Sequence, residues 1–218
     1  MIRISVGSHD VASGILLLPA DGPWCLDARL DDDPGLSVGQ PVSVTASDGT
    51  TFAGEIDSID VLVERVRVVV SPLGTSVLTK KAKPNVLRNC TIAHALAYIS
   101  SVAGIKSVYA GADNERRSHI VFHGLQNYHQ IIAALCPKDH VQSLRDGTLY
   151  VGPLKPGAAL GFVAQDRSAI NKSLQFACED SLDIWPGQSI TDMYFGTMQL
   201  GTIEIEIGDE VRGVGVIL

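Results

Sequence analysis

The sequence is poor in several features that mark common functional classes. Aromatic residues make up only 6% of the chain, and no apolar run approaches the ~20 residues that a membrane-spanning helix needs. The four cysteines (Cys25, Cys90, Cys136 and Cys178) lie far apart and form no Cys-x-x-Cys pair. The N-terminus alternates like a strand and lacks the apolar core of a signal peptide. We therefore expect buried free thiols, no membrane span, no zinc clip, and synthesis and use in a cytoplasm.

Clustered positive charge is also scarce. The net charge is −7, the pI is near 5.3, and the only basic cluster is Lys80-Lys81-Ala82-Lys83. Tight binding to nucleic acid needs clustered Lys and Arg that release counterions from the phosphates. We therefore expect an acidic surface that repels DNA.

What the sequence does contain is a large share of small and β-branched residues. Hydrophobic residues make up 45% of the chain, and 21 glycines divide them into short runs, a mixture that favours many short strands. Residues 1–78 alternate in strand fashion, and Asp48-Gly49, between expected strands at residues 41–46 and 51–56, is a dipeptide typical of hairpin turns. This segment is predicted to form a small barrel or sandwich.

Residues 79–153 carry a different pattern, which begins after a polar stretch that we interpret as a boundary. A helix is predicted between the N-cap Thr91 and Gly104, and a second helix begins at a capping box of Asn127 and Gln130. The expected strands cover residues 106–109, 120–122, 141–144 and 149–151. The segment is therefore predicted to be a compact α-β-β-α-β-β module.

Residues 154–218 return to strands, which are expected at residues 160–163, 174–177, 190–195, 201–207 and 211–218. The run Ile203-Glu204-Ile205-Glu206-Ile207 alternates between one dry and one wet face, and we expect it to be an edge strand available for pairing across subunits. The predicted fold class is mainly β with an α+β insert. Two small β-barrel-like domains, 1–78 and 154–218, flank the middle domain at 79–153.

Candidate catalytic and metal-binding patterns lack the context that their chemistry needs. Gly35-Leu36-Ser37-Val38-Gly39 matches Gly-x-Ser-x-Gly, but Pro41 and a strand follow where a nucleophile elbow needs a helix. The acidic run Asp31-Asp32-Asp33 lacks the ligand spacing of a calcium loop. One further group of residues could bind a divalent metal, but the spacing of these residues along the chain matches no common metal-binding motif. That group is His119, His123, His129, Asp139 and His140.

These patterns lead us to name no catalytic, cofactor-binding or metal-binding residue. We expect a protein that is not an enzyme and holds no cofactor. Trp24 and Trp185 each lie near a turn, where an aromatic residue usually caps the end of a barrel, although a sugar-binding platform stays open.

Three groups of motifs follow one another along the chain. The first segment contains Ser13-Gly14, Leu18-Pro19, Gly22-Pro23-Trp24, Val38-Gly39, Val42-Ser43-Val44, Asp48-Gly49 and Phe52-Ala53-Gly54-Glu55-Ile56. The middle segment closes with the run from Arg145-Asp146-Gly147-Thr148 to Gly152-Pro153, and the third contains Trp185-Pro186-Gly187-Gln188. This order resembles the baseplate and tail-tip hub proteins of tailed bacteriophages. The chain differs from them in having Tyr150 where tryptophan is frequent.

The resemblance implies a homotrimer in which each subunit gives two similar β barrels to a ring with pseudo-sixfold symmetry. That ring adapts the sixfold tail tube to the threefold spike or tip protein. The implied partners are tube or tube-initiator proteins, the spike or tip protein and the tape-measure protein. The implied location is the virion tail, assembled in the host cytoplasm. DNA would pass through the lumen without specific binding, which agrees with the acidic balance of the chain.

Two other hypotheses stay open. A glycan- or peptide-binding module would use the middle α+β domain, with a groove lined by Tyr109, Tyr128 and Tyr150. A hydrolase or metalloenzyme would be built on His119 and His123 and would contain zinc. A trimer in solution favours the hub, whereas a strict monomer that binds sugar favours the binding module.

Overall fold

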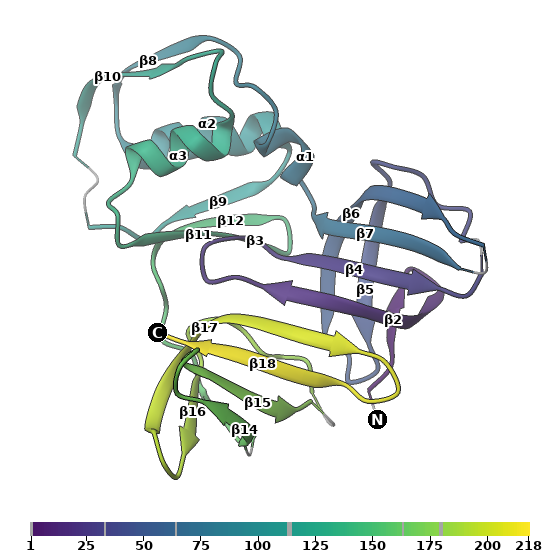
Figure 1. Ribbon diagram of the computed structural model, residues 1–218. Coiled ribbons are helices and arrows are strands. Elements are labelled where there is room, and N and C mark those ends of the chain that lie inside the picture. The colour runs from purple at the N-terminus through teal and green to yellow at the C-terminus, as the bar shows by residue number, and fades with distance from the viewer. Residues whose placement is uncertain (1, 33, 64, 113–114, 163, 179–180) are drawn as a thin grey trace.

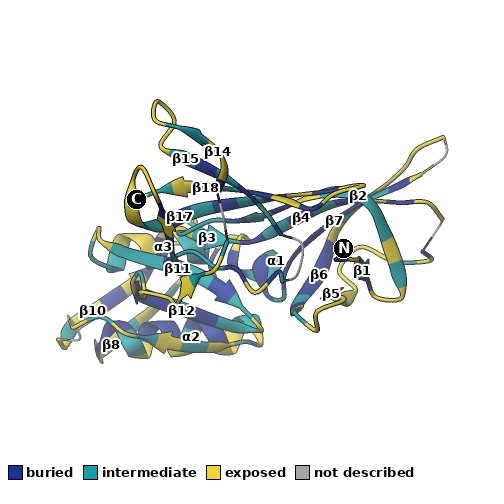
Figure 2. Ribbon diagram, turned by 90° about the horizontal axis from the view of Figure 1, so that it is seen from below, coloured by how far each residue is buried: buried dark blue, intermediate teal, exposed yellow. Residues whose placement is uncertain are grey.

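The computed structural model describes residues 2–32, 34–63, 65–112, 115–162, 164–178 and 181–218. The fold is mainly β, as the sequence predicts, and it contains a closed six-stranded barrel. Figure 2 shows that buried residues run along the strands and under the helices, whereas exposed residues gather in the connections. Within these ranges no helix has the length and apolar character that a membrane span requires.

Six strands of the first segment close into the barrel. They are β1 (Ile4–Val6), β2 (His9–Leu18), β4 (Cys25–Leu30), β5 (Pro41–Ala46), β6 (Thr51–Val61) and β7 (Val66–Pro72). They pair antiparallel in the order β1-β5-β6-β7-β4-β2, and β1 pairs again with β2, which completes the circle. Successive side chains point to opposite faces of a strand, so Val66, Val68 and Val70 of β7 are all buried in the interior.

The third segment extends this sheet rather than standing apart from it. Its strands are β13 (Ala159–Leu160), β14 (Ala164–Ser168), β15 (Ser173–Ala177), β16 (Ser189–Asp192), β17 (Gly196–Ile207) and β18 (Arg212–Ile217). Strand β17 pairs with β2, so both segments share one 12-stranded sheet and one hydrophobic core (Figure 1). The prediction that residues 203–207 form a free edge is wrong, because they pair with β18 on one side and with β2 on the other.

The middle segment has its own core, built around two helices. The helices are α2 (Ile92–Ala103) and α3 (Tyr128–Leu135), and both predicted N-caps, Thr91 and Asn127, are confirmed as capping boxes. The short helix α1 (Thr75–Leu78) precedes this module. Figure 1 shows α2 and α3 between a two-stranded ribbon and a four-stranded sheet. The ribbon pairs β8 (Asn85–Cys90) with β10 (Arg117–Phe122), and the sheet runs β3 (Gly22–Pro23), β11 (His140–Arg145), β12 (Thr148–Pro153) and β9 (Lys106–Tyr109).

Two features of the middle module differ from the predicted α-β-β-α-β-β order. Strand β8 precedes the first helix, where the sequence suggested only a polar connection. Strand β3, from the first segment, pairs with β11 and so links the barrel to this module. The domain boundaries at residues 79 and 154 stay predictions.

Candidate assembly interface

The two β units meet where β17 pairs with β2. Ile203 lies opposite Leu18, and Ile205 lies opposite Leu16, in an antiparallel register. All four side chains are buried in the shared core. The junction is therefore a continuous hydrogen-bonded sheet with an apolar inner face, which is the form of contact that an edge strand offers to another strand.

A turn of the barrel adds a polar contact to the junction. The Asp48 carboxylate accepts hydrogen bonds from the backbone N–H of Thr50 and from the backbone N–H of Leu182 in the third segment, each at 2.8 Å. Partial burial alone would raise the pKa of Asp48, but these hydrogen bonds outweigh it, so the pKa lies below its ordinary value. The charged carboxylate thus holds the second unit against the first.

A series of aromatic contacts links all three segments. Trp24 contacts Phe52 with ring centroids 5.5 Å apart, and Phe52 contacts Trp185 at 5.2 Å. The guanidinium of Arg145, from the middle module, lies 3.5 Å above the Trp185 ring. Trp24 is only 2% exposed and packs in the core, so a sugar platform that uses Trp24 is wrong.

The same strand arrangement occurs twice in the chain. Strands β2, β4, β7, β6 and β5 pair in that order, and β14, β15, β18, β17 and β16 pair in the same order. The register shifts also correspond. One residue is inserted between β2 and β4 and one between β14 and β15, and the same holds for β6–β7 and β17–β18. Such bulges are specific structural features, so their double match indicates an internal duplication.

One turn repeats in atomic detail. In the first unit the backbone N–H of Gly39 donates to Ile56 O at 2.8 Å, and Gln40 Oε1 accepts from the backbone N–H of Ser37 at 3.0 Å. In the second unit Gly187 donates to Leu200 O at 2.8 Å, and Gln188 Oε1 accepts from the backbone N–H of Trp185 at 2.6 Å. Both glycines have positive φ, 81° and 94°. The sequence signal is a shared Gly-Gln dipeptide, which a comparison of the two segments could have found.

The two units differ in how they end. In the first unit β1 pairs antiparallel with both β5 and β2, which closes the barrel. In the second, β13 pairs parallel with β16, and the described residues show no pairing between β13 and β14. Residue 163, which the predicted strand 160–163 includes, lies outside the described residues. The second unit therefore presents β14 as the last strand of the 12-stranded sheet.

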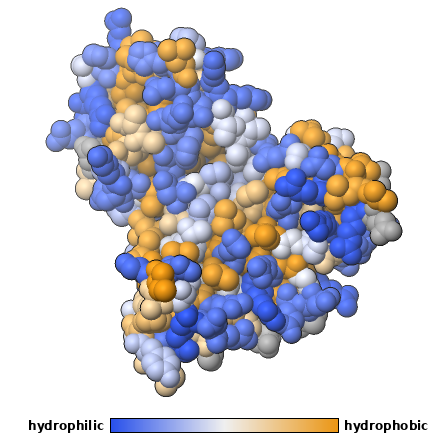
Figure 3. All heavy atoms as spheres, viewed as in Figure 1, coloured by the Kyte–Doolittle hydropathy of each residue, from blue (hydrophilic) through white to orange (hydrophobic). Residues whose placement is uncertain are grey.

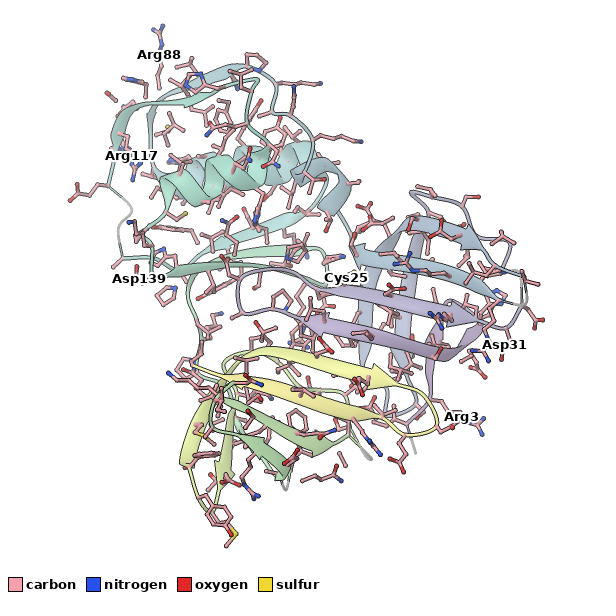
Figure 4. All side chains as sticks on the ribbon, viewed as in Figure 1. Arg3, Cys25, Asp31, Arg88, Arg117 and Asp139 are labelled. Atoms are coloured by element: carbon pink, nitrogen blue, oxygen red, sulfur yellow. The ribbon has the colours of Figure 1, made fainter. Side chains whose placement is uncertain are left out.

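The residues considered for catalysis or metal binding lie apart from this junction. Ser37 belongs to the repeated turn and precedes β5, not a helix. No cluster of three or more potential metal ligands occurs within the described ranges. Asp31, near the end of the barrel remote from the middle module (Figure 4), lies 3.3 Å from Arg65. Asp33 lies outside the described residues.

The three tyrosines proposed to line one groove do not share a surface. Tyr128 is only 2% exposed and packs in the core of the middle module. Tyr109 stacks edge-on against His140. Tyr150 faces a cavity of about 570 Å³ that lies against Trp185 and Arg145, and burial raises the pKa of its hydroxyl. The predicted tyrosine groove is therefore wrong.

Comparisons with known proteins were made for both sequence and structure. No protein-family model matches the sequence, and no curated protein matches it. The E. coli c3393 protein, described as a component of the type VI secretion system with structural similarity to T4 bacteriophage tail proteins, superimposes with a TM-score of 0.76. Its sequence is 11% identical, and the match covers 99% of this chain and 76% of that chain.

Two prophage or bacterial tail proteins give similar matches. The tail protein of prophage MuSo2 from Shewanella oneidensis has a TM-score of 0.72 at 11% identity, covering 100% of this chain and 97% of that chain. The tail protein from Neisseria meningitidis MC58 has a TM-score of 0.72 at 12% identity, covering 99% and 95%. Identities this low are evidence about fold alone. The resemblance to bacteriophage baseplate and tail-tip proteins is confirmed as a shared fold, and it extends along essentially the whole chain.

Proposed function

We propose that this protein is a structural tail hub without enzymatic activity. Three copies form a ring that adapts a sixfold tail tube to a threefold spike or tip protein. The observation that carries the proposal is the internal duplication, because each chain presents two similar β units joined sheet to sheet. Three such chains present six similar β units to a sixfold tube. The rest of each chain occurs three times in the ring, which matches a threefold spike.

The junction within the chain supports a ring rather than a symmetric dimer. One unit uses β17 and the other uses β2, so the two contacting surfaces are different. Repetition of a head-to-tail contact generates closed rings when the rotation per unit closes. The net charge of −7 agrees with a channel through which DNA slides without binding.

Mass in solution and electron microscopy test this proposal. Light scattering on the purified full chain is expected to give about 70 kDa, three times the chain mass of 23.2 kDa, either alone or after addition of the spike protein. Class averages are expected to show a ring around a pore. A strict monomer that binds sugar, with or without tube and spike proteins, would contradict the hub and favour the binding module.

A further inference from the structure

The formal charge of the chain is divided unevenly between its segments. Residues 79–153 contain nine Lys and Arg but only four Asp and Glu, whereas the rest of the chain contains eight Lys and Arg and twenty Asp and Glu. The middle module therefore carries a charge of +5, and the two β units together carry −12, which accounts for the −7 of the whole chain. Opposite charges on two parts of one chain favour different partners for the two parts.

The β8–β10 ribbon of the middle module has two faces of different character, because side chains alternate along each strand. Ile120 points inward and packs in the core of the module. On the opposite face, Val86 lies across from Val121, and Arg88 lies across from His119. All four of these side chains are exposed. They form the outer face of the ribbon, which consists of one apolar pair beside one basic pair.

The outer face is open to contact with another molecule. Val86 is 49% exposed and Val121 is 37% exposed, and no described side chain forms an ion pair with Arg88. Figure 4 shows Arg88 projecting from the ribbon, away from the helices. In Figure 3 the same end of the middle module is mostly hydrophilic, with hydrophobic atoms among the polar ones. The Arg88 guanidinium can therefore bind a carboxylate from outside the chain.

Further basic residues lie next to the outer face. Arg116 and His123 directly precede and follow β10, and both are exposed. The carboxylates Asp139 and Asp146 flank β11, in the sheet on the other side of the helices (Figure 1). Among the described residues of the module, only Glu115 places a carboxylate beside the ribbon in the sequence. Basic side chains therefore outnumber acidic ones around the exposed apolar pair.

We propose that the outer face of the ribbon binds an extended segment of an acidic partner protein, in which an apolar side chain lies between two carboxylates. The apolar side chain covers Val86 and Val121 and removes their exposed surface from water. A carboxylate two residues along the segment reaches Arg88 and His119, because alternate residues of an extended chain point to the same side. This inference goes beyond the proposed ring and does not depend on it, since the outer face belongs to the middle module and not to the β units.

A protein segment suits the outer face better than a nucleic acid does. Binding to a phosphate backbone depends on clustered Lys and Arg that release counterions. Half of the outer face is instead apolar, and Arg88 is its only Arg or Lys. A segment that combines carboxylates with an apolar side chain complements both pairs, whereas phosphates complement the basic pair alone.

A designed peptide tests this interaction directly. The probe is a dye-labelled peptide, Glu-Ser-Val-Ser-Glu-Ser-Val-Ser-Glu, which places its Glu and Val side chains on one side when extended. Titration with the full chain is expected to raise the fluorescence anisotropy of the probe. Higher salt is expected to weaken the binding, because exposed charges are screened. The same peptide with Lys in place of Glu, or with Ser in place of Val, is expected to bind at least ~5-fold more weakly.

Variants within the middle module locate the binding site. Arg88→Glu is expected to raise the Kd for the peptide about 5- to 20-fold, because it replaces an attraction by a repulsion. Lys106→Glu changes the charge equally at an exposed position of β9, and it is expected to change the Kd by no more than about 2-fold. Val121→Thr is expected to weaken the binding, whereas Val108→Thr, at a similarly exposed valine of β9, is not. Equal losses for Arg88→Glu and Lys106→Glu would mean that net charge, and not the outer face, attracts the peptide.

Three other results would overturn the proposal. The first is a wild-type chain that is folded and does not bind the peptide at low salt. The second is an oligothymidine strand that binds more tightly than the peptide in the same buffer, which would make the partner a nucleic acid. The third is a lower mass of the assembled protein in light scattering for Arg88→Glu, which would make the partner a second copy of this chain. The mass is expected to stay unchanged, so peptide binding and ring formation can fail independently.

Discussion

The two β units contain the same strands in the same pairing order, yet among the described residues only the first unit closes on itself. Its β1 pairs with both β2 and β5, whereas the second unit begins with a two-residue strand that pairs parallel to β16. The second unit instead shares its hydrophobic core with the first, because one cluster of buried side chains includes residues of both units. Two copies of a unit can therefore keep the same strand order while one forms a closed barrel and the other extends the sheet of the first.

The two units also differ in which of their strand edges are paired within the chain. Barrel closure removes edges, and an edge that remains open is a site for pairing with another chain. In this protein one set of equivalent edges, β2 and β17, is joined inside the chain. Among the described residues, β14 pairs only with β15, and the part of β6 that follows Ile56 pairs only with β7. Predictions that compare equivalent residues in the two units test whether the environment of a residue, rather than its type, determines its contribution to stability.

The largest difference is expected between Ile205 and Val61. They occupy equivalent positions, because each lies five residues after the residue, Leu200 or Ile56, whose carbonyl oxygen accepts from the repeated glycine. Ile205→Ala is expected to destabilise the single chain by about 2–5 kcal/mol, because it leaves a cavity in the shared core. Val61→Ala is expected to change the stability of the single chain by no more than about 0.5 kcal/mol, since this side chain is exposed there. Urea unfolding at a concentration below assembly measures both. Equal costs would contradict the difference in burial between the two positions.

The repeated turns provide the next comparison. Gly39 and Gly187 both have positive φ, so alanine at either position is expected to cost about 1–2 kcal/mol of backbone strain. A Cβ at Gly187 would also meet the Lys155 carbonyl oxygen, whereas a Cβ at Gly39 would point into open space. Gly187→Ala is therefore expected to cost about 1–3 kcal/mol more than Gly39→Ala. Thermal unfolding of the two variants checks the order, and an equal loss would contradict the close approach of residue 155.

A smaller, pH-dependent difference is expected at Asp192 in the second unit. Its carboxylate accepts from Arg167 Nε at 2.6 Å and from the backbone N–H groups of Tyr194 and Phe195 at 2.8 and 3.1 Å. Burial alone would raise the pKa of Asp192, but these contacts outweigh it and place the pKa below the ordinary 3.8. The stabilisation is therefore complete above about pH 4–5 and is lost as the pH falls through the lowered folded pKa.

Substitution separates this contact from general acid denaturation. Asp192→Asn is expected to be less stable than the wild type at pH 7 and to lose less stability between pH 5 and pH 3. Asp209→Asn, at an exposed residue between β17 and β18, is expected to retain the wild-type pH profile. Urea midpoints at pH 7, 5 and 3 give the comparison. A parallel pH profile for Asp192→Asn and the wild type would show that the pair with Arg167 does not anchor β14.

Local signals predicted the elements of the middle module well. The capping boxes at Thr91 and Asn127 are short-range chemistry that the chain carries in a few residues, and the structure has both helices where the sequence puts them. The same holds for the Asp48-Gly49 turn between β5 and β6. Strand β8 was missed because its alternation is weak and a basic, proline-containing stretch precedes it.

Long-range relations were harder to predict. The alternation of residues 203–207 correctly indicated one buried face, but it carries no information about which strands lie on either side. The sequence reading therefore expected an edge where the structure has an interior strand. It also ended the strand before β6 actually does, at Ile56, and so missed the exposed apolar run that follows. Which strands lie next to each other in a sheet depends on the tertiary fold. The correspondence between residues 203–207 and the run after Ile56 became visible only when the two units were compared.

The smallest expected difference is between the two glutamines of the repeated turns. Gln188 Oε1 accepts from the backbone N–H of Trp185 at 2.6 Å, and its Nε2 donates to the Asp183 carbonyl at 3.4 Å. Gln40 makes the equivalent first contact at 3.0 Å, but from an exposed position where water can replace it. Gln188→Ala is expected to cost about 1 kcal/mol and Gln40→Ala about half of that or less. Chemical unfolding with the two variants side by side measures the difference, and a larger loss for Gln40→Ala would mean that the first turn, and not the second, fixes the entry to its sheet.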